Sequence, residues 1–236
     1  MSFNSSGNSF QRDNPVVFGL IVANVIVFVA QLLLKNFNLS EWGALHHYSS
    51  EYFKPHQIIT NMFMHDTGRS IFMHLFFNMF CLYTFGTWLE KIWGSKRFFS
   101  FYMVCGVGAS IIMMLSIPYS AGIWADSPIA IQKLGTNIAA NKDWYINYTS
   151  AVGASGALMG ISAAFAYLFP NTELMLMFIP FPIKAKFLIP GFILIDLFGG
   201  FTGSGNGVGN FAHLGGALIG FLIVLYWNKT NKKTFY

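Results

Sequence analysis

Residues 15–34 form a run of 20 residues without a single charged side chain, and five further apolar runs follow it along the chain. A helix rises about 1.5 Å per residue, so a run of this length reaches across the roughly 30 Å hydrocarbon core of a bilayer. Charged residues make up only 10% of the chain, against about 25% in soluble domains. So few charges cannot cover a surface that faces water. The sequence therefore predicts an integral membrane protein that crosses the bilayer several times.

Each apolar run is predicted to form one helix, which gives an all-α membrane protein with a bundle of six transmembrane helices. The fourth and fifth runs are short for a span, and the fifth contains Pro190. Such short helices need support from neighbouring helices or a locally thinned bilayer. The six predicted spans cover residues 15–34, 71–89, 98–117, 153–169, 187–198 and 208–227.

The spans lie in one domain, 15–228, between two polar ends. Residues 1–14 are rich in Asn and Ser and are expected to form a disordered cytoplasmic tail. They lack the basic start and the small-residue cleavage site of a signal peptide, so no processing is expected. Residues 229–236 are expected to form a basic cytoplasmic tail.

Three connecting segments differ in character. Residues 35–70 are too long for a simple connector and are expected to form a structured interfacial loop with short helical pieces. Residues 118–149 are expected to form a polar loop. Residues 199–209 contain six glycines in eleven positions and are expected to be mobile.

Lysine and arginine are enriched on the cytoplasmic side of membrane proteins, and this bias orients the chain. With both termini in the cytoplasm, the inner segments carry nine basic residues and the longer outer loops carry five. We therefore expect both termini in the cytoplasm, and topology accounts for the formal charge of +5 without a nucleic-acid partner. Because no organelle-targeting presequence is seen, a bacterial-type plasma membrane is favoured. The inner residues are Arg12, Lys91, Lys96, Arg97, Lys184, Lys186, Lys229, Lys232 and Lys233, and the outer residues are Lys35, Lys54, Arg69, Lys133 and Lys142.

The histidines and cysteines do not predict a cofactor. Cys81 and Cys105 lie in apolar runs and are interpreted as small core residues. A metal site built from His65, His74 and His213 has neither an HExxH motif nor a carboxylate at ligand spacing. No metal and no cofactor are therefore expected.

Four polar residues are expected at a common depth in the membrane. In the predicted topology the second, fourth and sixth helices all run from the outside to the inside. His74 and Asn78 lie in the first two turns of the second helix, Ser155 opens the fourth, and His213 lies near the start of the sixth. All four are within roughly 10 Å of the outer ends of their helices. This agreement indicates one polar chamber sunk below the outer surface.

Small residues indicate that the fourth and sixth helices pack closely. His213 shares one stripe of the sixth helix with three glycines, two of which form a GxxxG pair that lets another backbone approach. The fourth helix offers a matching surface of small residues, so close packing would bring Ser155 beside His213. The stripe is Gly209, His213, Gly216 and Gly220, and the matching surface is Gly156, Gly160 and Ala164.

These residue types suit attack on an amide bond. A serine hydroxyl needs a base in hydrogen-bond contact, and a neutral histidine can accept its proton and later donate it. Gly153 and Gly156 flank the serine and allow backbone to come close to its hydroxyl. The developing oxyanion needs preplaced donors, which the backbone N–H of Ser155 and the side chains of His74 and Asn78 can supply.

Plainer interpretations stay open for each residue taken singly. Ser155 could cap a helix N-terminus, and His213 could serve as a structural hydrogen-bonding group in the membrane interior. The four polar residues taken together favour the catalytic interpretation.

The sequence resembles the rhomboid intramembrane serine proteases over nearly the whole chain from the first span onward. The motifs that carry this resemblance are Gly153-Ala154-Ser155-Gly156, an AHxxGxxxG helix at Ala212-His213 with Gly216 and Gly220, and an HxxxN element at His74 and Asn78. The resemblance implies a six-helix rhomboid-type bundle, a Ser-His dyad without a catalytic aspartate, and hydrolysis of peptide bonds in or near the transmembrane helices of membrane-protein substrates. It also implies that the fifth helix and the loop after it gate the site.

One position near the serine departs from the resemblance. Many members place an aromatic ring one turn after the serine, stacked on the histidine, where this chain has Met159. A thioether is a softer contact for an imidazole.

Asp196 lies outside these motifs. It could complete a triad with His213, reach the interface near the outer end of the fifth helix, or bond a neighbouring helix. The resemblance to a dyad family argues against the triad.

Two rival functions stay open beside an intramembrane protease. One is a catalytically inactive rhomboid-like protein that binds transmembrane clients, although such relatives typically lack the serine or the histidine. The other is a transporter or channel, which predicts inverted repeats that the sequence does not contain. Glycines next to Ser155 weakly favour small substrate residues at the cut. The sequence does not indicate the substrate or the oligomeric state.

Overall fold

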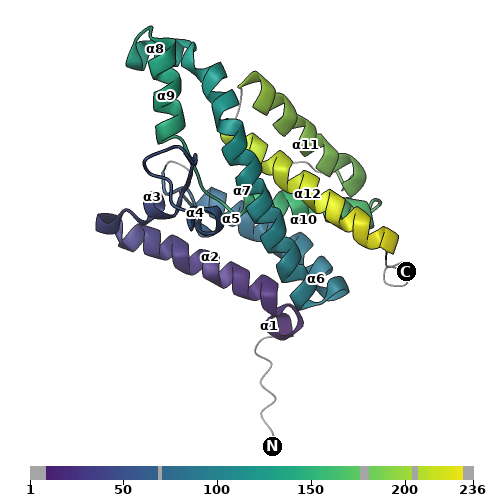
Figure 1. Ribbon diagram of the computed structural model, residues 1–236. Helices are drawn as coiled ribbons and strands as arrows, with labels where there is room; N and C mark the ends of the chain where they lie inside the picture. Colours follow the sequence, from purple (N-terminus) through teal and green to yellow (C-terminus); the bar gives the residue numbers. More distant parts are fainter. Residues whose placement is uncertain (1–8, 69–70, 176–180, 204–206, 231–236) are drawn as a thin grey trace, which may run out of the picture.

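The fold is a bundle of apolar helices, seen here in a computed structural model that describes residues 9–68, 71–175, 181–203 and 207–230 (Figure 1). Within these described residues, four helices are long and apolar enough to cross a membrane. A fifth apolar helix, α10, is shorter, and a sixth segment is made of α5 and α6 with a helical turn between them. The predicted all-α membrane bundle is thereby confirmed. The four long helices are α2 (Pro15–Leu33), α7 (Ser95–Ala125), α11 (Ala185–Thr202) and α12 (Val208–Thr230).

The second membrane segment is one helical run with a local change of winding. It consists of α5 (Ile71–Cys81), the π-helical segment η3 (Leu82–Gly86) and α6 (Thr87–Trp93). Near its end, the buried carboxylate of Glu90 accepts hydrogen bonds from the backbone N–H groups of Val16 and Val17 at 2.9 and 2.8 Å. These groups have no partner within α2 because they belong to its first turn, where the helix dipole also favours a negative charge. Glu90 therefore fixes the start of α2 against α6.

The segment between α2 and α5 is structured, as expected for 35–70. It contains η1 (Lys35–Phe37), α3 (Leu39–Gly43), β1 (Leu45–His46), α4 (Gln57–Thr60) and η2 (Asn61–Phe63). The side chain of Gln31 donates to the backbone carbonyl of His65 at 2.9 Å and accepts from its N–H at 3.0 Å. This pair of bonds ties the end of the loop to α2, just before α5 begins.

The region expected to be a polar loop, 118–149, is mostly helical. The helix α7 continues to Ala125 because Ile117, Ala121 and Ala125 extend one fully buried face, four residues apart. Two further helices follow, α8 (Pro128–Leu134) and α9 (Ile138–Tyr148). Polar composition gave the wrong prediction here, because the buried stripe of α7 is made of small residues as well as large ones.

The two added helices begin at side-chain caps. Ser127 accepts a hydrogen bond from the N–H of Ala130, and Asn137 accepts one from the N–H of Ala140, both at 3.2 Å. Such caps satisfy N–H groups that a helix start leaves unpaired. After α9, the strand β2 (Ser150–Ala151) pairs antiparallel with β1. This pairing holds the loop against the segment that leads into α10.

The fifth membrane helix is longer than expected. The predicted span 187–198 lies within α11, which begins after a short antiparallel pair, β3 (Glu173–Leu174) and β4 (Ile183–Lys184), and extends to Thr202. Gly200, expected in a mobile segment, is helical because it packs against a ring: an added Cβ would lie 3.2 Å from Phe211. Gly203 directly follows the helix, and its φ of 70° is a conformation that suits glycine at this position. Residues 204–206 of the expected mobile segment lie outside the described residues.

The N-terminal end also differs from the expectation of disorder for 1–14. Residues Ser9–Asp13 form the short helix α1, in which the ring of Phe10 packs on that of Tyr83 at 5.2 Å between centroids. An aromatic residue in a polar stretch supplied this anchor. Residues 1–8 of this tail and 231–236 of the basic tail lie outside the described residues.

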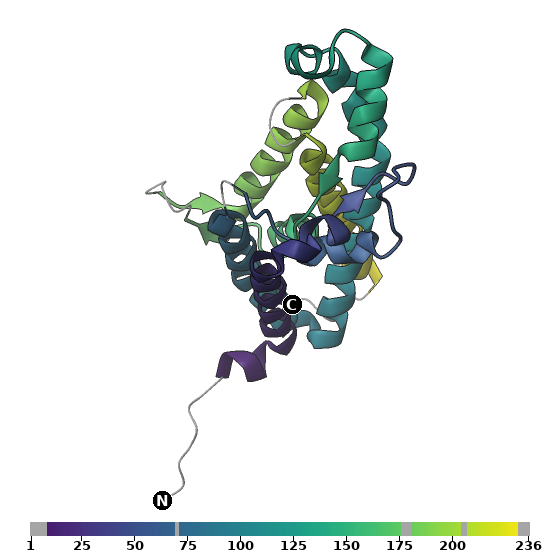
Figure 2. The same ribbon diagram turned by 90° about the vertical axis from the view of Figure 1, so that its left-hand side faces the viewer.

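The core of the bundle surrounds α10 (Ser155–Leu168), most of which is buried. Its neighbours include α7, α11 and α12. Figures 1 and 2 both show α8 and α9 at one end of the bundle and α1 at the opposite end. Trp227, near the end of α12, stacks edge-on against Trp93 of α6 at 5.2 Å between ring centroids. The start of α2 and the end of α12 therefore lie at the same end as α6.

Candidate active site

Ser155 and His213 are in hydrogen-bond contact. Ser155 is the first residue of α10, and His213 lies five residues after the start of α12 at Val208. The serine Oγ is 2.9 Å from the histidine Nε2. The two residues are 58 positions apart in sequence, so helix packing has to bring them together.

Glycines on the facing surfaces of α10 and α12 allow this approach. A Cβ added at Gly216 would overlap the carbonyl of Gly156, and one added at Gly160 would lie 2.9 Å from the carbonyl oxygen of Gly216. A Cβ on Gly220 would in turn collide with the backbone of Gly160. Real Cβ atoms do not come this close to backbone atoms. The two helices therefore touch backbone to backbone, as GxxxG packing requires.

Gly153 brings the segment before the serine against α5. Its φ is +130°, a conformation that side chains rarely adopt. An added Cβ would lie 3.0 Å from His74 Nε2 and 3.6 Å from Ser155 Oγ. Its N–H donates to the carbonyl of Asn61 at 2.9 Å, which anchors the turn to η2. Glycine at this position therefore leaves a small space between the serine and His74.

His74 and Asn78, four residues apart, lie on one face of α5. The backbone N–H of Asp66 donates to His74 Nδ1 at 3.4 Å, so a neutral His74 carries its hydrogen on Nε2, the nitrogen close to Gly153. Asn78 lies one turn further along α5 and is 5% exposed. Its amide nitrogen has no hydrogen-bond partner among the residues that the structure describes. A buried donor without a partner calls for an explanation, and a ligand atom that accepts its hydrogen bond provides one.

The neighbour of His74 is a second histidine. The ring of His65, between η2 and α5, meets that of His74 edge to face at 5.2 Å between centroids. Burial, and secondarily the nearby His74, lowers the pKa of His65 from 6.5 to about 4. His65 is therefore neutral at pH 7 and adds no charge beside His74.

Asp196 reaches the other side of the histidine. Its Oδ2 lies 3.1 Å from His213 Nδ1, with 15% of the aspartate side chain and 20% of the histidine side chain exposed. The sequence left this residue open between a triad, the interface and a neighbouring helix, and the structure places it against His213 on the neighbouring α12. The only signal for this contact in the sequence is a carboxylate within an apolar span.

The remaining glycine and methionine lie around the serine. A small cavity of about 40 Å³ is lined by Gly209 and Ser155 and also by the polar residues Asn61 and Ser110. A space of this size accommodates on the order of one or two water molecules. Met159 follows Ser155 by one turn of α10 and is partly buried.

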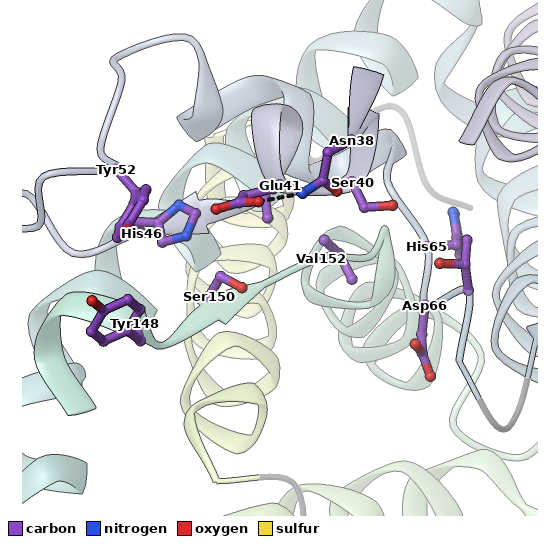
Figure 3. Close-up of a pocket in the computed structure, with 12 residues that line it drawn as sticks. Asn38, Ser40, Glu41, His46, Tyr52, His65, Asp66, Tyr148, Ser150 and Val152 are labelled. Carbon is purple, nitrogen blue, oxygen red and sulfur yellow. Dashed lines mark hydrogen bonds between the residues drawn. The ribbon is translucent and has the colours of Figure 1, made fainter. Parts of the chain in front are cut away.

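A larger polar pocket of about 350 Å³ reaches Val152, in the segment that leads to the serine (Figure 3). Figure 3 shows His46 and Tyr52 toward one end of it and His65 and Asp66 toward the other. Its lining includes Val152, the residue before Gly153, but neither Ser155 nor His213. The pocket therefore borders the turn before the serine from the side of the segment between α2 and α5.

The sulfur and acidic groups form no metal centre within the described part of the chain. There, His, Cys, Asp and Glu residues make no group of three or more that could hold a metal ion. Cys105 is buried, and Cys81 Sγ lies 3.6 Å from the hydroxyl of Ser162 in the packed interior.

Comparisons with known proteins agree on one protein family. A family model described as the Rhomboid domain matches residues 52–229 of this chain. The chain is 29% identical to rhomboid protease AarA of Providencia stuartii over 211 residues, which cover 84% of this chain and 65% of that protein. It is 31% identical over 232 residues to the mitochondrial RHOMBOID-like protein 12 of Arabidopsis thaliana, covering 94% of this chain and 60% of that protein. It is also 30% identical over 179 residues to the mitochondrial rhomboid protein 1 of Saccharomyces cerevisiae, covering 75% and 43%. The chain thus spans between 43% and 65% of the length of these relatives.

Proposed function

Because this chain belongs to the rhomboid family, we propose that it is an intramembrane serine protease that uses Ser155 and His213 as its catalytic dyad. The observation that carries the proposal is the 2.9 Å contact between Ser155 Oγ and His213 Nε2 inside a bundle of apolar helices. A serine and a base in this contact form the basic unit of nucleophilic catalysis by serine hydrolases.

The first half-reaction forms an acyl-enzyme. His213 Nε2 takes the proton of Ser155 as the Oγ attacks the carbonyl carbon of the scissile peptide bond. A tetrahedral intermediate forms with a negative charge on the former carbonyl oxygen. His213 then donates the proton to the leaving nitrogen, the carbon–nitrogen bond breaks, and the substrate acyl group remains as an ester on Ser155. Water repeats the sequence in the second half-reaction and releases the acid.

The negative oxygen needs donors that are in place before the reaction. We assign this role to the backbone N–H of Ser155 at the start of α10 and to the side chains of His74 and Asn78. The hydrogen on His74 Nε2 and the unpartnered amide of Asn78 support the assignment. Donors aimed at a developing charge in a dry site stabilise the transition state more than the ground state.

Rhomboid proteases act on membrane-protein substrates, so the proposed substrates are proteins with a transmembrane helix cleaved in or near that helix. The glycines around Ser155 favour small residues next to the cut. Cleavage of bulky residues at an equal rate would argue against that preference.

We further propose that 15–228 is the protease domain and that both termini lie in the cytoplasm. The excess of basic residues on the inner segments and the shared end of α2 and α12 at α6 support this orientation. The relatives include a protein from a bacterium and mitochondrial proteins, and the proposed location in this case is a bacterial plasma membrane.

A fluorophosphonate probe tests the dyad without a known substrate. The probe phosphonylates activated serines and releases fluoride. We expect it to label the detergent-solubilised wild-type protein and to leave Ser155→Ala unlabelled. Ser162→Ala is the matched control, because Ser162 lies two turns along the same helix and donates to the carbonyl of Leu158 at 2.8 Å. A folded wild-type protein that does not react would instead favour an inactive relative that binds transmembrane clients.

The oxyanion assignment predicts a graded loss. Asn78→Ala should lower kcat by about 10²-fold with little change in KM, because the donor acts on charge that develops in the transition state. Asn78→Asp keeps the shape of the side chain but replaces the donor with an acceptor, and it should lose at least as much. Steady-state kinetics on a cleavable transmembrane peptide measure both parameters. A kcat near that of the wild type in Asn78→Ala would remove Asn78 from the mechanism.

A further inference from the structure

Three side chains from three helices form one hydrogen-bonded chain. Asp196 of α11 contacts Nδ1 of His213 on α12, at 3.1 Å, and Nε2 of that histidine contacts Ser155 of α10 at 2.9 Å. We propose that Asp196 is a positioning residue that holds His213 in the tautomer and orientation required for catalysis, so that the site operates as a Ser-His-Asp triad. This inference rests on the proposed function and departs from the dyad that the family resemblance implies.

The carboxylate determines which nitrogen of His213 carries the hydrogen. An ionised carboxylate can only accept hydrogen bonds, so Nδ1 of the histidine must be the donor in this contact. A neutral imidazole has a single N–H, and Nε2 is then left with a free lone pair. That lone pair faces Ser155 Oγ and can accept its proton. Asp196 therefore selects the tautomer that works as a base, and it does so before substrate binds.

The same contact favours the charge that appears during the reaction. When His213 takes the serine proton, the ring becomes an imidazolium 3.1 Å from the carboxylate oxygen. Both side chains are largely shielded from solvent, so their attraction is weakened less than it would be in water. This attraction stabilises the state in which the proton has moved to His213. It therefore lowers the activation barrier and does not stabilise the ground state.

The carboxylate of Asp196 also needs a polar partner at its position in α11. The neighbouring side chains Leu194 and Ile195 are 63% and 68% exposed on a helix apolar enough to cross a membrane. A carboxylate in such a helix is costly unless it is paired with another polar group. His213 is that partner, and Asp196 lies near the outer end of α11, at the depth expected for the chamber around Ser155.

A purely structural role is the competing explanation, in which the ion pair only fastens α11 to α12. The two roles differ in what they do to the histidine ring. A structural link predicts loss of stability and activity together. A positioning role predicts a change of tautomer and a slower reaction at Ser155 in a protein that remains folded.

The experiment compares Asp196→Asn, Asp196→Ala and the conservative Asp196→Glu with wild type. The rate of fluorophosphonate labelling reports on Ser155, thermal unfolding in detergent reports on the fold, and ¹⁵N NMR of labelled histidine reports which ring nitrogen carries the hydrogen. The His213→Ala spectrum identifies the signals of His213. Asp126→Asn is the matched control, because it removes a carboxylate that is exposed at the end of α7.

We expect His213 in wild type to carry its hydrogen on Nδ1 and to transfer it to Nε2 in Asp196→Asn, whose amide can donate to Nδ1. Labelling of Asp196→Asn should slow by about 10²-fold or more. Asp196→Ala should be slowed less than the asparagine variant, Asp196→Glu should recover part of the rate, and Asp126→Asn should match wild type.

Two results would overturn the inference. One is a folded Asp196→Asn protein that labels within about three-fold of the wild-type rate, well short of the loss expected for a wrong tautomer. The other is a wild-type His213 with its hydrogen on Nε2, and this readout decides the matter if the variants fail to fold. A wild type that is not labelled at all contradicts the proposed protease, whereas the tautomer of His213 still tests the role of Asp196 separately.

Discussion

Replacing His213 with alanine should reduce cleavage of a transmembrane substrate by on the order of 10⁴-fold or more, and Ser155→Ala should have an equal effect. Each change removes one of two groups that work only together, because the serine reacts only when Nε2 of the histidine can accept its proton. The double variant should therefore be no slower than the slower single variant. Additive losses would mean that the two residues act independently.

The measurement needs a membrane environment and a folding control. Single-span peptides with a fluorophore and a quencher on either side of the helix, incorporated into vesicles with the protein, report cleavage directly. Thermal unfolding should change little for Ser155→Ala, since the serine side chain is a small group at the start of α10. Cleavage by Ser155→Ala at the wild-type rate would disprove the mechanism.

The sequence was sufficient to predict the pairing of Ser155 with His213 for a physical reason. The depth of each residue follows from its distance along an apolar run, and its face follows from the helical repeat. Glycines at Gly156 and Gly216 then indicate which faces touch, because only a surface without side chains lets two backbones meet. The depth of the two residues, the helix faces on which they lie and the close contact of the two helices together leave little freedom for their placement.

The same reasoning could not place Asp196. In a membrane, lipid-facing and protein-facing surfaces are both apolar, so periodicity does not fix the rotation of a helix that lacks a small-residue stripe. The predicted end of the fifth helix, at residue 198, was also too early, because Gly199 and Gly200 suggested that a mobile segment begins there. In the structure the glycine at 200 accommodates the ring of Phe211. The helix extends to Thr202, so Asp196 lies six residues before its end and not two residues before it, as the predicted span implied.

The segments that connect the membrane helices were the least predictable part of the fold for a related reason. Their structure depends on single polar contacts between distant segments, such as the bonds from Gln31 to His65 and from Gly153 to Asn61. A contact of this kind has no periodic pattern. These segments nevertheless hold the turn that presents Ser155, so part of the candidate site depends on structure that the sequence alone does not show.

The contact between α10 and α12 should be the most sensitive point of the fold. Gly216→Ala places a Cβ where the carbonyl of Gly156 now lies, and a backbone carbonyl cannot rotate away as a side chain can. Overpacking a well-fitted interior typically costs about 1–3 kcal/mol, and the cost here should reach about 3 kcal/mol or more because backbone has to move. Denaturation of the detergent-solubilised protein with SDS, followed by circular dichroism, measures the loss.

Gly19→Ala is the matched control, for which no loss of stability is expected. Gly19 is a helical glycine of α2 with no atom within 4 Å of an added Cβ, so the change should leave stability unaltered or raise it by about 0.5–1 kcal/mol through helix propensity. Separation of α10 from α12 in Gly216→Ala should also part Ser155 from His213, and probe labelling should fall with stability. A Gly216→Ala protein as stable and as reactive as Gly19→Ala would mean that the two helices do not depend on backbone contact. The pairing of serine and histidine would then need another explanation, because this contact is what brings residues 58 positions apart within hydrogen-bond distance.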